Sequence, residues 1–419
     1  MSRLPPNSLG FALLQAARIN TAVFAGQSLA DGLLARVDPV ARPAVQDLVY
    51  GSLRRYGRGD FFLGRLLSKP LAEPEVRALL LVAIYRLETR PDAAHTVVDQ
   101  AVSAAGELAE GHLRPLVNGV LRNFLRQQTA LTAALVEDPV AEFQHPDWWL
   151  TRLQAAYPAD WPAIVAAGNA APPMALRVNQ RRCERADYQA RLAAEGIAAT
   201  AVGEAGLALD KPVPVDRLPG FADGLVSVQD PGAQLAASLL NPRPGSRVLD
   251  ACAAPGGKTA HLLERAELDL LALDLKPSRC KRVTENLDRL GLSAAIKAAD
   301  CAKLNTWWDG EPFDAVLADV PCTASGVVRR NPDAKWLRRE TDIASFAAAQ
   351  SRILDALWQV VRPGGKLLYA TCSVFPAENG LQIDDFLARQ PQARRCHEEQ
   401  LLPTAEHDGF FYCLLEKLS

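Results

Sequence analysis

Residues 247–258 read RVLDACAAPGGK, and this stretch decides the fold of the chain. Val248 and Leu249 suit a buried parallel strand, and Asp250 lies at its carboxyl end. The proline and glycines that follow let a ligand approach the backbone closely. From Thr259 onward the leucines have helical spacing, so backbone amides at a helix N-terminus point at whatever the loop holds. Open parallel sheets bind ligands at this edge.

Three further apolar runs also end in an acidic residue: LDLLALD at Asp274, AAIKAAD at Asp300 and FDAVLAD at Asp319. Asp274 follows the loop at the distance where nucleotide-binding units place an acid on a ribose. Ordinary solvation of strand ends is the plain alternative, but four acids in register favour a ligand site. The loop lacks the GxGxxG pattern of a dinucleotide fold. Acids around it favour cationic S-adenosylmethionine over NAD, which disfavours a dehydrogenase.

Length and composition set the broad class. A chain of 419 residues forms two or three domains with a sizeable core. Eight cysteines without a CxxC pair indicate neither a disulfide framework nor a metal site, and no signal peptide is recognisable, so we expect a cytosolic, reduced protein. No apolar segment is long enough to span a bilayer. Nothing in the sequence suggests an obligate dimer, and we expect a monomer.

Residues 8–136 show helical periodicity only. Through Val136 the chain carries 15 basic and 11 acidic residues, and Lys69 is the one lysine among fourteen arginines. Arginine makes forked contacts to phosphate, although a solvated helix face explains the same composition. The segments HTVVDQAVSAAGEL (95–108) and LVNGVLRNFLR (116–126) resemble the NusB family of helical RNA-binding proteins. This resemblance implies an all-α domain that helps to hold an RNA substrate.

Residues 137–240 contain helical and extended segments, which predicts a linker and a small α+β subdomain. Within it, VQDPGAQ carries Gln229, Asp230 and Gln234 just before the strand and loop at residues 247–258. These three residues could form a cap, a turn or part of the site. An acid before Pro-Gly is a ready turn and helix start, so we interpret Asp230 as a helix cap.

Two cysteines follow strands at the edge expected to face the methyl donor. Cys322 lies in ADVPCTASG after the fourth strand, and Cys372 lies in LLYATCSVF after the fifth. Carbon 5 of cytosine is a poor nucleophile, so a methyltransferase first adds a thiolate to carbon 6. A second group then helps to undo the adduct. The chemistry alone does not decide which thiol attacks.

Neighbouring polar residues suit an RNA substrate. Asp319 can hydrogen-bond the base at N3 and N4, and Arg329, Arg330 and Lys335 offer phosphate contacts from the loop that follows. A solvated loop is the alternative for these three cations.

The motifs around Lys258, Cys322, Cys372 and Gln229 resemble the Sun and Nop2 family of RNA cytosine-5 methyltransferases over roughly residues 140–419. The resemblance implies Cys372 as the nucleophile and Cys322 as the residue that assists release. It also implies a set of donor-site residues: Cys252, Ala253, Ala254, Pro255, Gly256, Gly257, Lys258, Asp274, Asp300 and Asp319. With the NusB-like front end, the chain is similar to bacterial enzymes that act on 16S ribosomal RNA. The RNA substrate is expected to be either free or part of a partly assembled small subunit.

The expected architecture has three parts. Residues 1–136 form a NusB-like helical domain, residues 137–240 the linker and subdomain, and residues 241–419 a Rossmann-like methyltransferase. The last has a doubly wound sheet of about seven strands, with one antiparallel strand near its end. A transfer RNA cytosine-5 methyltransferase and a non-catalytic RNA-binding factor are the alternative functions.

Overall fold

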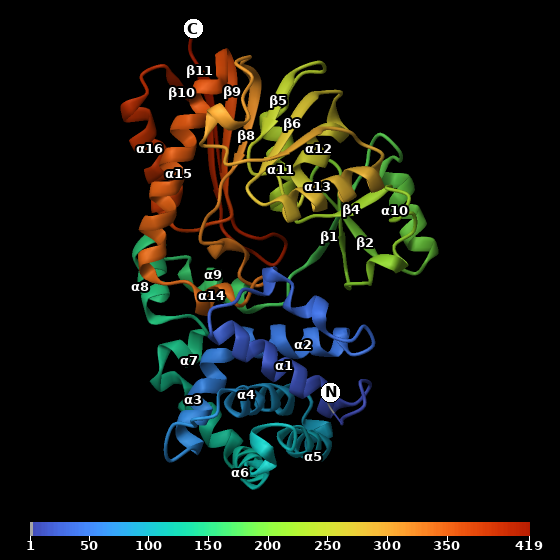
Figure 1. The fold of residues 1–419 in the computed structure, drawn as a ribbon, viewed down its shortest axis with the longest axis vertical. Coiled ribbons are helices and arrows are strands. Elements are labelled where there is room, and N and C mark those ends of the chain that lie inside the picture. Colours follow the sequence, from blue (N-terminus) through green and yellow to red (C-terminus); the bar gives the residue numbers. More distant parts are fainter. Residues whose placement is uncertain (1–2) are drawn as a thin grey trace. The chain divides into compact units, whose positions relative to one another are not determined.

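The computed structural model describes residues 3–419, which divide into two compact units (Figure 1). The helical unit runs to Asn169 and also includes Val328–Arg339, and the sheet unit comprises Ala170–Val327 and Glu340–Ser419. Among these described residues, no helix is both long and apolar enough to cross a membrane.

The helical unit is built around a central apolar helix, α4. Its residues Val76, Leu79, Val82 and Ile84 are buried around the whole circumference, and α4 contacts α1, α2, α3, α5 and α6. A helix that is apolar on all sides belongs in a core. The all-helical prediction for this region is confirmed. The helices are α1 Leu9–Phe24, α2 Arg42–Arg54, α3 Tyr56–Leu66, α4 Pro74–Thr89, α5 Ala94–Ala105, α6 Arg114–Ala133, α7 Pro139–Phe143, α8 Asp147–Ala156, α9 Trp161–Asn169 and α14 Ala334–Leu337.

Residues 137–169, which the sequence assigned to the linker, belong to the helical unit. Helix α7 packs against α3 because Gly57 has no side chain at the contact. A Cβ atom there would lie 2.4 Å from the Val140 carbonyl oxygen. The Arg58 backbone N–H also donates to the Gln144 side-chain oxygen at 3.1 Å. These contacts extend the helical unit beyond the predicted boundary.

The segment Val328–Arg339 leaves the sheet unit soon after Cys322 and is embedded among the helices. The Arg54 guanidinium donates to the Arg329 carbonyl oxygen at 3.0 and 3.1 Å. The Asp333 carboxylate accepts from the Ser28 hydroxyl at 2.9 Å, and the Trp336 indole donates to a backbone carbonyl of α2. The helical unit is therefore completed by a segment more than 270 positions away in sequence from Arg54.

Lys335, in this segment, is fully buried. Its ammonium donates to the Asn169 side-chain oxygen at 2.8 Å and to the Arg54 carbonyl oxygen at 3.2 Å. Burial, with the nearby Arg54 guanidinium, lowers the pKa of Lys335 to about 7. The folded chain therefore releases this proton far more easily than the unfolded chain does.

We expect the free energy of unfolding to rise with pH above about 7, because the unfolded state then binds more protons at Lys335 than the folded state. Thermal unfolding of Lys335→Met between pH 7 and 9.5 should show a flatter pH dependence than the parent. Lys69→Met, at an exposed position of the same unit, is the control. Equal slopes for parent and Lys335→Met would contradict the argument.

The sheet unit begins with a small antiparallel subdomain. Its strands have the order β2-β3-β1-β4, and α10 covers them through the buried side chains Tyr188 and Leu192. The prediction of a small α+β subdomain is confirmed. The elements are β1 Met174–Val178, α10 Arg185–Ala194, β2 Ala199–Val202, β3 Gly206–Leu209 and β4 Val226–Val228.

The main sheet has seven strands in the order β10-β11-β9-β8-β5-β6-β7. All neighbouring pairs from β9 to β7 are parallel, and β11 is antiparallel to β9, as predicted. Starting from β5, the chain adds β6 and β7 on one side and then β8 and β9 on the other. Ligands of such sheets usually bind at the carboxyl ends of the strands where this change of direction occurs. The strands are β5 Arg247–Asp250, β6 Asp269–Asp274, β7 Ala295–Ala298, β8 Phe313–Asp319, β9 Val361–Thr371, β10 Ala393–Leu401 and β11 Phe410–Lys417.

Helices cover both faces of this sheet (Figure 1). Alternate residues of each strand point to opposite faces, so Val248 packs with α11, α12 and α13 while Leu249 packs with α15 and α16. These strands are buried on both faces and therefore read as continuous apolar runs. The covering helices are α11 Pro231–Leu240, α12 Gly257–Arg265, α13 Pro277–Leu290, α15 Glu340–Val360 and α16 Gly380–Arg389.

Candidate active site

The loop between β5 and α12 is held by backbone hydrogen bonds to the neighbouring strands. The Ala251 N–H donates to Leu317 of β8 at 2.9 Å, and the Ala253 N–H donates to Leu273 of β6 at 2.7 Å. Gly256 has φ +100°, and a Cβ atom there would lie 3.2 Å from the Val283 backbone. The glycine thus permits both the left-handed turn and the close approach of α13.

The acids predicted at strand ends lie around this loop. Asp274 is 4% exposed and accepts from the Ala254 N–H at 3.2 Å, so it orders the loop directly. Asp300 accepts from the Ala302 N–H at 3.0 Å and precedes Cys301. The sulfur of Cys301 lies 4.0 Å from that of Cys252, which places the Asp300 turn beside the loop.

Asp250 is the most deeply buried of these carboxylates, at 1% exposed. Its Oδ2 accepts from the Thr259 hydroxyl at 2.6 Å, whereas its Oδ1 has no hydrogen-bond partner within residues 3–419. Burial raises the pKa of Asp250 to about 7. A buried carboxylate oxygen without a partner fits a ligand that brings a hydrogen-bond donor or a positive charge.

Lys258 ends the loop and joins it to β8. Its ammonium donates to the Asp319 carboxylate at 2.6 Å. Burial alone would lower the pKa of Lys258, but the Asp319 carboxylate outweighs it and the pKa is raised. Lys258 therefore stays protonated and provides a fixed positive charge that also acts on Cys372.

The two cysteine thiols that the sequence predicts at the site lie next to each other. The sulfur atoms of Cys322 and Cys372 lie 3.4 Å apart, because β8 and β9 are adjacent parallel strands with Asp319 opposite Ala370. Cys322 is 7% exposed, and Cys372 is more accessible. The hydrogen bond with Cys372, together with burial, raises the pKa of Cys322 well above its usual range. Cys322 is therefore a neutral thiol that can donate to its neighbour.

Comparison with known proteins matches all three parts of the chain. The family described as "16S rRNA methyltransferase RsmB/F" matches residues 237–416, a ferredoxin-like domain of RsmF/B-like methyltransferases matches 145–216, and the NusB family matches 13–126. Ribosomal RNA small subunit methyltransferase B of Vibrio cholerae is 45% identical over 94% of each chain. The Pseudomonas putida protein of the same name is 45% identical over 97% of this chain and 98% of its own. The chain belongs to the RsmB/F methyltransferase family.

This membership confirms the resemblances to the Sun and Nop2 family and to NusB, and the RsmB/F family consists of S-adenosylmethionine-dependent methyltransferases of ribosomal RNA. The crystal structure of PH0851 has the same fold, with a TM-score of 0.82 at 23% identity over the full length of both chains. The unpartnered Asp250 oxygen and the glycine loop fit the methyl donor of this family.

Two of the three predicted phosphate contacts are buried in this RsmB/F chain. Arg329 is 1% exposed and Lys335 is 0% exposed, because their segment folds into the helical unit instead of forming a solvated loop. Burial argues against direct phosphate contact for both. Arg330 is partly exposed, and its contact with phosphate stays a prediction.

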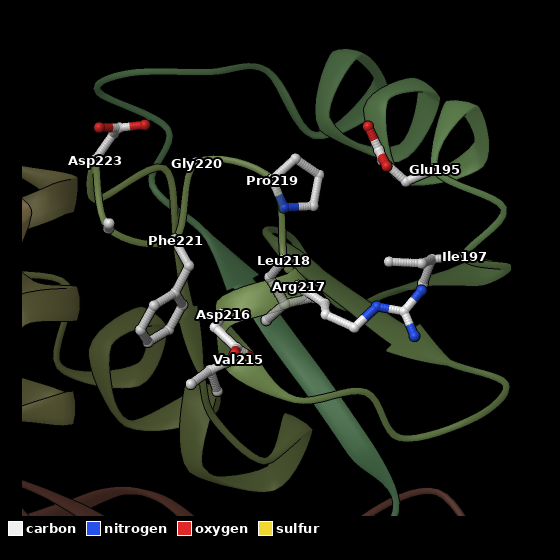
Figure 2. A pocket seen from close by; sticks show the side chains of 11 residues that line it. Glu195, Ile197, Val215, Asp216, Arg217, Leu218, Pro219, Gly220, Phe221 and Asp223 are labelled. Atoms are coloured by element: carbon white, nitrogen blue, oxygen red, sulfur yellow. The ribbon is translucent and has the colours of Figure 1, made fainter.

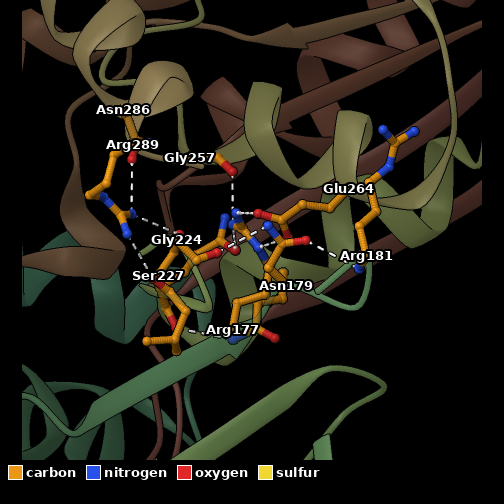
Figure 3. Close-up of polar contacts among 12 residues, drawn as sticks. Arg177, Asn179, Arg181, Gly224, Ser227, Gly257, Glu264, Asn286 and Arg289 are labelled. Carbon is orange, nitrogen blue, oxygen red and sulfur yellow. Dashed lines mark hydrogen bonds and ion pairs between the residues drawn. The ribbon is translucent and has the colours of Figure 1, made fainter. Parts of the chain in front are cut away.

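The sequence interpretation missed Arg177, which is fully buried on β1. It makes two 2.7 Å hydrogen bonds to Glu264 of α12, and its Nη1 donates to the Gly257 carbonyl oxygen at 2.8 Å (Figure 3). Nη1 also donates to the Gln229 side-chain oxygen at 2.5 Å. Arg177 therefore joins the small subdomain to Gly257, the first residue of α12. Its sequence signal is an arginine in the otherwise apolar strand MALRV.

The interpretation of Asp230 as a helix cap is confirmed. Its Oδ1 accepts from the Gly232 N–H at 2.9 Å at the start of α11. Gln234 lies inside this helix and donates to the Gln229 carbonyl oxygen at 3.1 Å. Both side chains thus have local structural partners.

A separate cavity of about 690 Å³ lies in the small subdomain (Figure 2). It is lined by Glu195, Ile197 and residues 215–223. None of the predicted catalytic or donor-site residues lines it, so this cavity is distinct from the RsmB/F site.

We expect the affinity for S-adenosylmethionine to increase as pH rises through about 7, because the ionised Asp250 carboxylate attracts the cationic donor and protonation removes that charge. Isothermal titration calorimetry from pH 6 to 8 measures this. Asp250→Asn should give a weaker and flatter profile, and Asp210→Asn, at an exposed position of the same unit, should retain the parent profile. A pH-independent parent would contradict the expectation.

Replacement of Arg177 should destabilise the sheet unit, because Glu264 would be left as a buried charge without its cation. We expect Arg177→Met to lower the free energy of unfolding by about 3–5 kcal/mol. The double variant with Glu264→Gln should recover much of that loss, and Arg185→Met, at a solvent-accessible arginine of the same subdomain, should have little effect. Urea denaturation tests this, and a single variant as stable as the parent would refute it.

Proposed function

We propose that the chain transfers a methyl group from S-adenosylmethionine to carbon 5 of a cytosine in 16S ribosomal RNA, through a covalent bond between Cys372 and carbon 6. One observation carries this proposal: the sulfur atoms of Cys322 and Cys372 lie 3.4 Å apart. The donor loop reaches the same strand ends, since Lys258 binds Asp319 of β8. A single thiol has many explanations, but paired thiols at a methyl-donor site suit addition to a pyrimidine.

The geometry supports Cys372 as the nucleophile. It is more accessible than Cys322, and the Lys258 ammonium and a Cys372 thiolate attract each other. Cys322 is buried and remains a neutral thiol because its pKa is raised by the hydrogen bond to Cys372 and by burial. These differences support the same assignment that the family resemblance implies.

The reaction then follows in balanced steps. The Cys372 thiolate forms a bond to carbon 6, and the electron pair displaced from the C5–C6 double bond makes carbon 5 nucleophilic. Carbon 5 would then bond to the methyl group while the bond between that methyl and the donor sulfur breaks, and the electron pair of the broken bond would stay on the sulfur as a neutral thioether. The carbon 5 proton then leaves to solvent water. Its electron pair re-forms the double bond and expels Cys372 as a thiolate. The Cys322 thiol stabilises that leaving sulfur by donating a hydrogen bond.

The bound donor supplies an electrophilic methyl group on a sulfonium. The residues that would hold it are the loop Cys252–Lys258, Asp274 and Asp300, together with Asp250 at the end of β5. Asp319, which accepts from the Lys258 ammonium, would also accept from a cytosine amino group.

Ribosomal RNA as the substrate is supported by the family and by the names of the relatives, which are small subunit methyltransferases. The helical unit would hold the RNA, as its NusB match suggests. A stacked base hides carbons 5 and 6 from the thiol, so the target cytosine must be unpaired or flipped out of its helix.

Labelled S-adenosylmethionine and 16S ribosomal RNA test the proposal. Cys372→Ala should lose methylation by at least a thousandfold and form no denaturation-resistant RNA adduct. Cys322→Ala should accumulate that adduct, because release is impaired. Cys413→Ala, at a buried thiol in β11, is the control.

The opposite pattern of adducts would reverse the two roles. No adduct from either variant, together with retained methylation, would refute the covalent mechanism. Methylation of transfer RNA in preference to 16S RNA would refute the substrate assignment.

A further inference from the structure

Glu378 is a fully buried carboxylate behind the two thiols. Its Oε1 accepts from the Thr323 N–H at 2.8 Å, and its Oε2 accepts from the hydroxyls of Thr323 and Ser373 at 2.5 Å each. Gln350 of α15 donates to Oε1 at 3.1 Å. Glu378 therefore joins three separate segments of the sheet unit.

Thr323 and Ser373 are the residues that directly follow Cys322 and Cys372. One carboxylate thus binds both cysteine-bearing turns at the same place in each. Ser325 adds to the connection, because its hydroxyl lies 3.0 Å from that of Ser373 and accepts from the Val374 N–H at 2.9 Å. This shared polar cluster therefore connects the two cysteine-bearing turns directly.

The partners of Glu378 are neutral. Neither lysine nor arginine forms an ion pair with it within the described residues 3–419, and burial raises its pKa. A buried carboxylate without a cation is costly to retain. A neutral side chain would fill the same space at lower cost, so the charge and its several acceptor sites point to a function at the thiols.

Residue Asn379 reinforces the same turn. Its amide donates to the Ser373 carbonyl oxygen at 2.9 Å, and its side-chain oxygen accepts from the Thr371 hydroxyl at 2.6 Å. Both neighbours of Cys372, Thr371 through its hydroxyl and Ser373 through its carbonyl oxygen, are therefore bound by the residue that follows Glu378. Glu378 itself holds the turn that carries Cys322, because its carboxylate accepts from the Thr323 N–H.

We propose that Glu378 is a positioning residue that sets the separation and orientation of the Cys322 and Cys372 thiols by hydrogen-bonding Thr323 and Ser373. This inference rests on the proposed function, because it assigns the carboxylate to the geometry that adduct formation and release require. Glu378 acts through its neighbours and does not touch the base.

The first test measures thiol geometry without catalysis. Phenylarsine oxide binds two thiols at once only when they are close together. In a chain with Cys301→Ser, which removes the Cys252–Cys301 pair whose sulfurs lie 4.0 Å apart, Glu378→Gln should bind the arsenical at least tenfold more weakly than its parent. Glu406→Gln, at an exposed position of the same unit, should bind as the parent does. Cys322→Ala should abolish bridging.

The second test measures the reaction. Glu378→Gln should slow adduct formation at least tenfold while the Kd for S-adenosylmethionine stays within twofold, since the carboxylate does not contact the donor loop. Single-hydroxyl variants separate the two turns and keep the test valid if Glu378→Gln does not fold. Ser373→Ala should slow adduct formation, whereas Thr323→Val should slow release and accumulate adduct.

The outcomes distinguish this inference from the proposed function. Weaker arsenical binding in a chain whose parent forms no RNA adduct would support the positioning by Glu378 and refute the covalent mechanism. Arsenical binding and adduct rates within twofold of the parent, for a folded Glu378→Gln or for both hydroxyl variants, would overturn the inference. A fall in all properties together, including donor affinity, would indicate a merely structural carboxylate and would also overturn it.

Discussion

The parallel pairing of β8 with β5 on one side and β9 on the other is the constraint on which the site depends. Asp250 of β5 lies opposite Leu317, and Asp319 lies opposite Ala370, so the carboxyl ends of three strands meet at one edge. Segments that are distant in sequence thereby bring the proposed donor loop, the Asp319 carboxylate and the two thiols to neighbouring positions. Each strand must be apolar on both faces to be buried there, which leaves the strand ends as the places for polar chemistry.

Buried charge is the second theme of the structure. Moving an ionised group out of water is costly unless partners replace the solvent. Arg177 and Glu264 form a fully buried ion pair, so each charge has the other as its partner in place of water. This pair joins the small subdomain to α12. Asp250 and Glu378 are different, since their pKa values are raised by burial and neither forms an ion pair in the described chain. Both lie where we place the chemistry, one at the donor loop and one behind the thiols.

Much of the fold and of the site could be predicted from sequence, because these features have local signals. Apolar runs that end in acids identify the parallel strands, and helical periodicity identifies the front of the chain. Arg329 and Lys335 show where such reasoning failed, since a loop rich in cations reads as solvated although it is buried among helices. Arg177 and Glu378 were not singled out, because a lone charged residue carries no periodic pattern and most of its partners lie 28 or more positions away along the chain.

The sequence by itself determined the strand-loop-helix of the donor loop, the order of the strands along the chain and the two cysteines that follow adjacent strands. These follow from spacing and side-chain type, which act over a few residues. Only the tertiary structure decided that the thiols lie 3.4 Å apart, that Cys322 is the buried member of the pair and that one carboxylate binds both turns. The distance between the two sulfurs and the burial of Cys322 arise from the packing of segments some 50 residues apart in sequence. Contacts over such a separation produce no recognisable pattern in the local sequence.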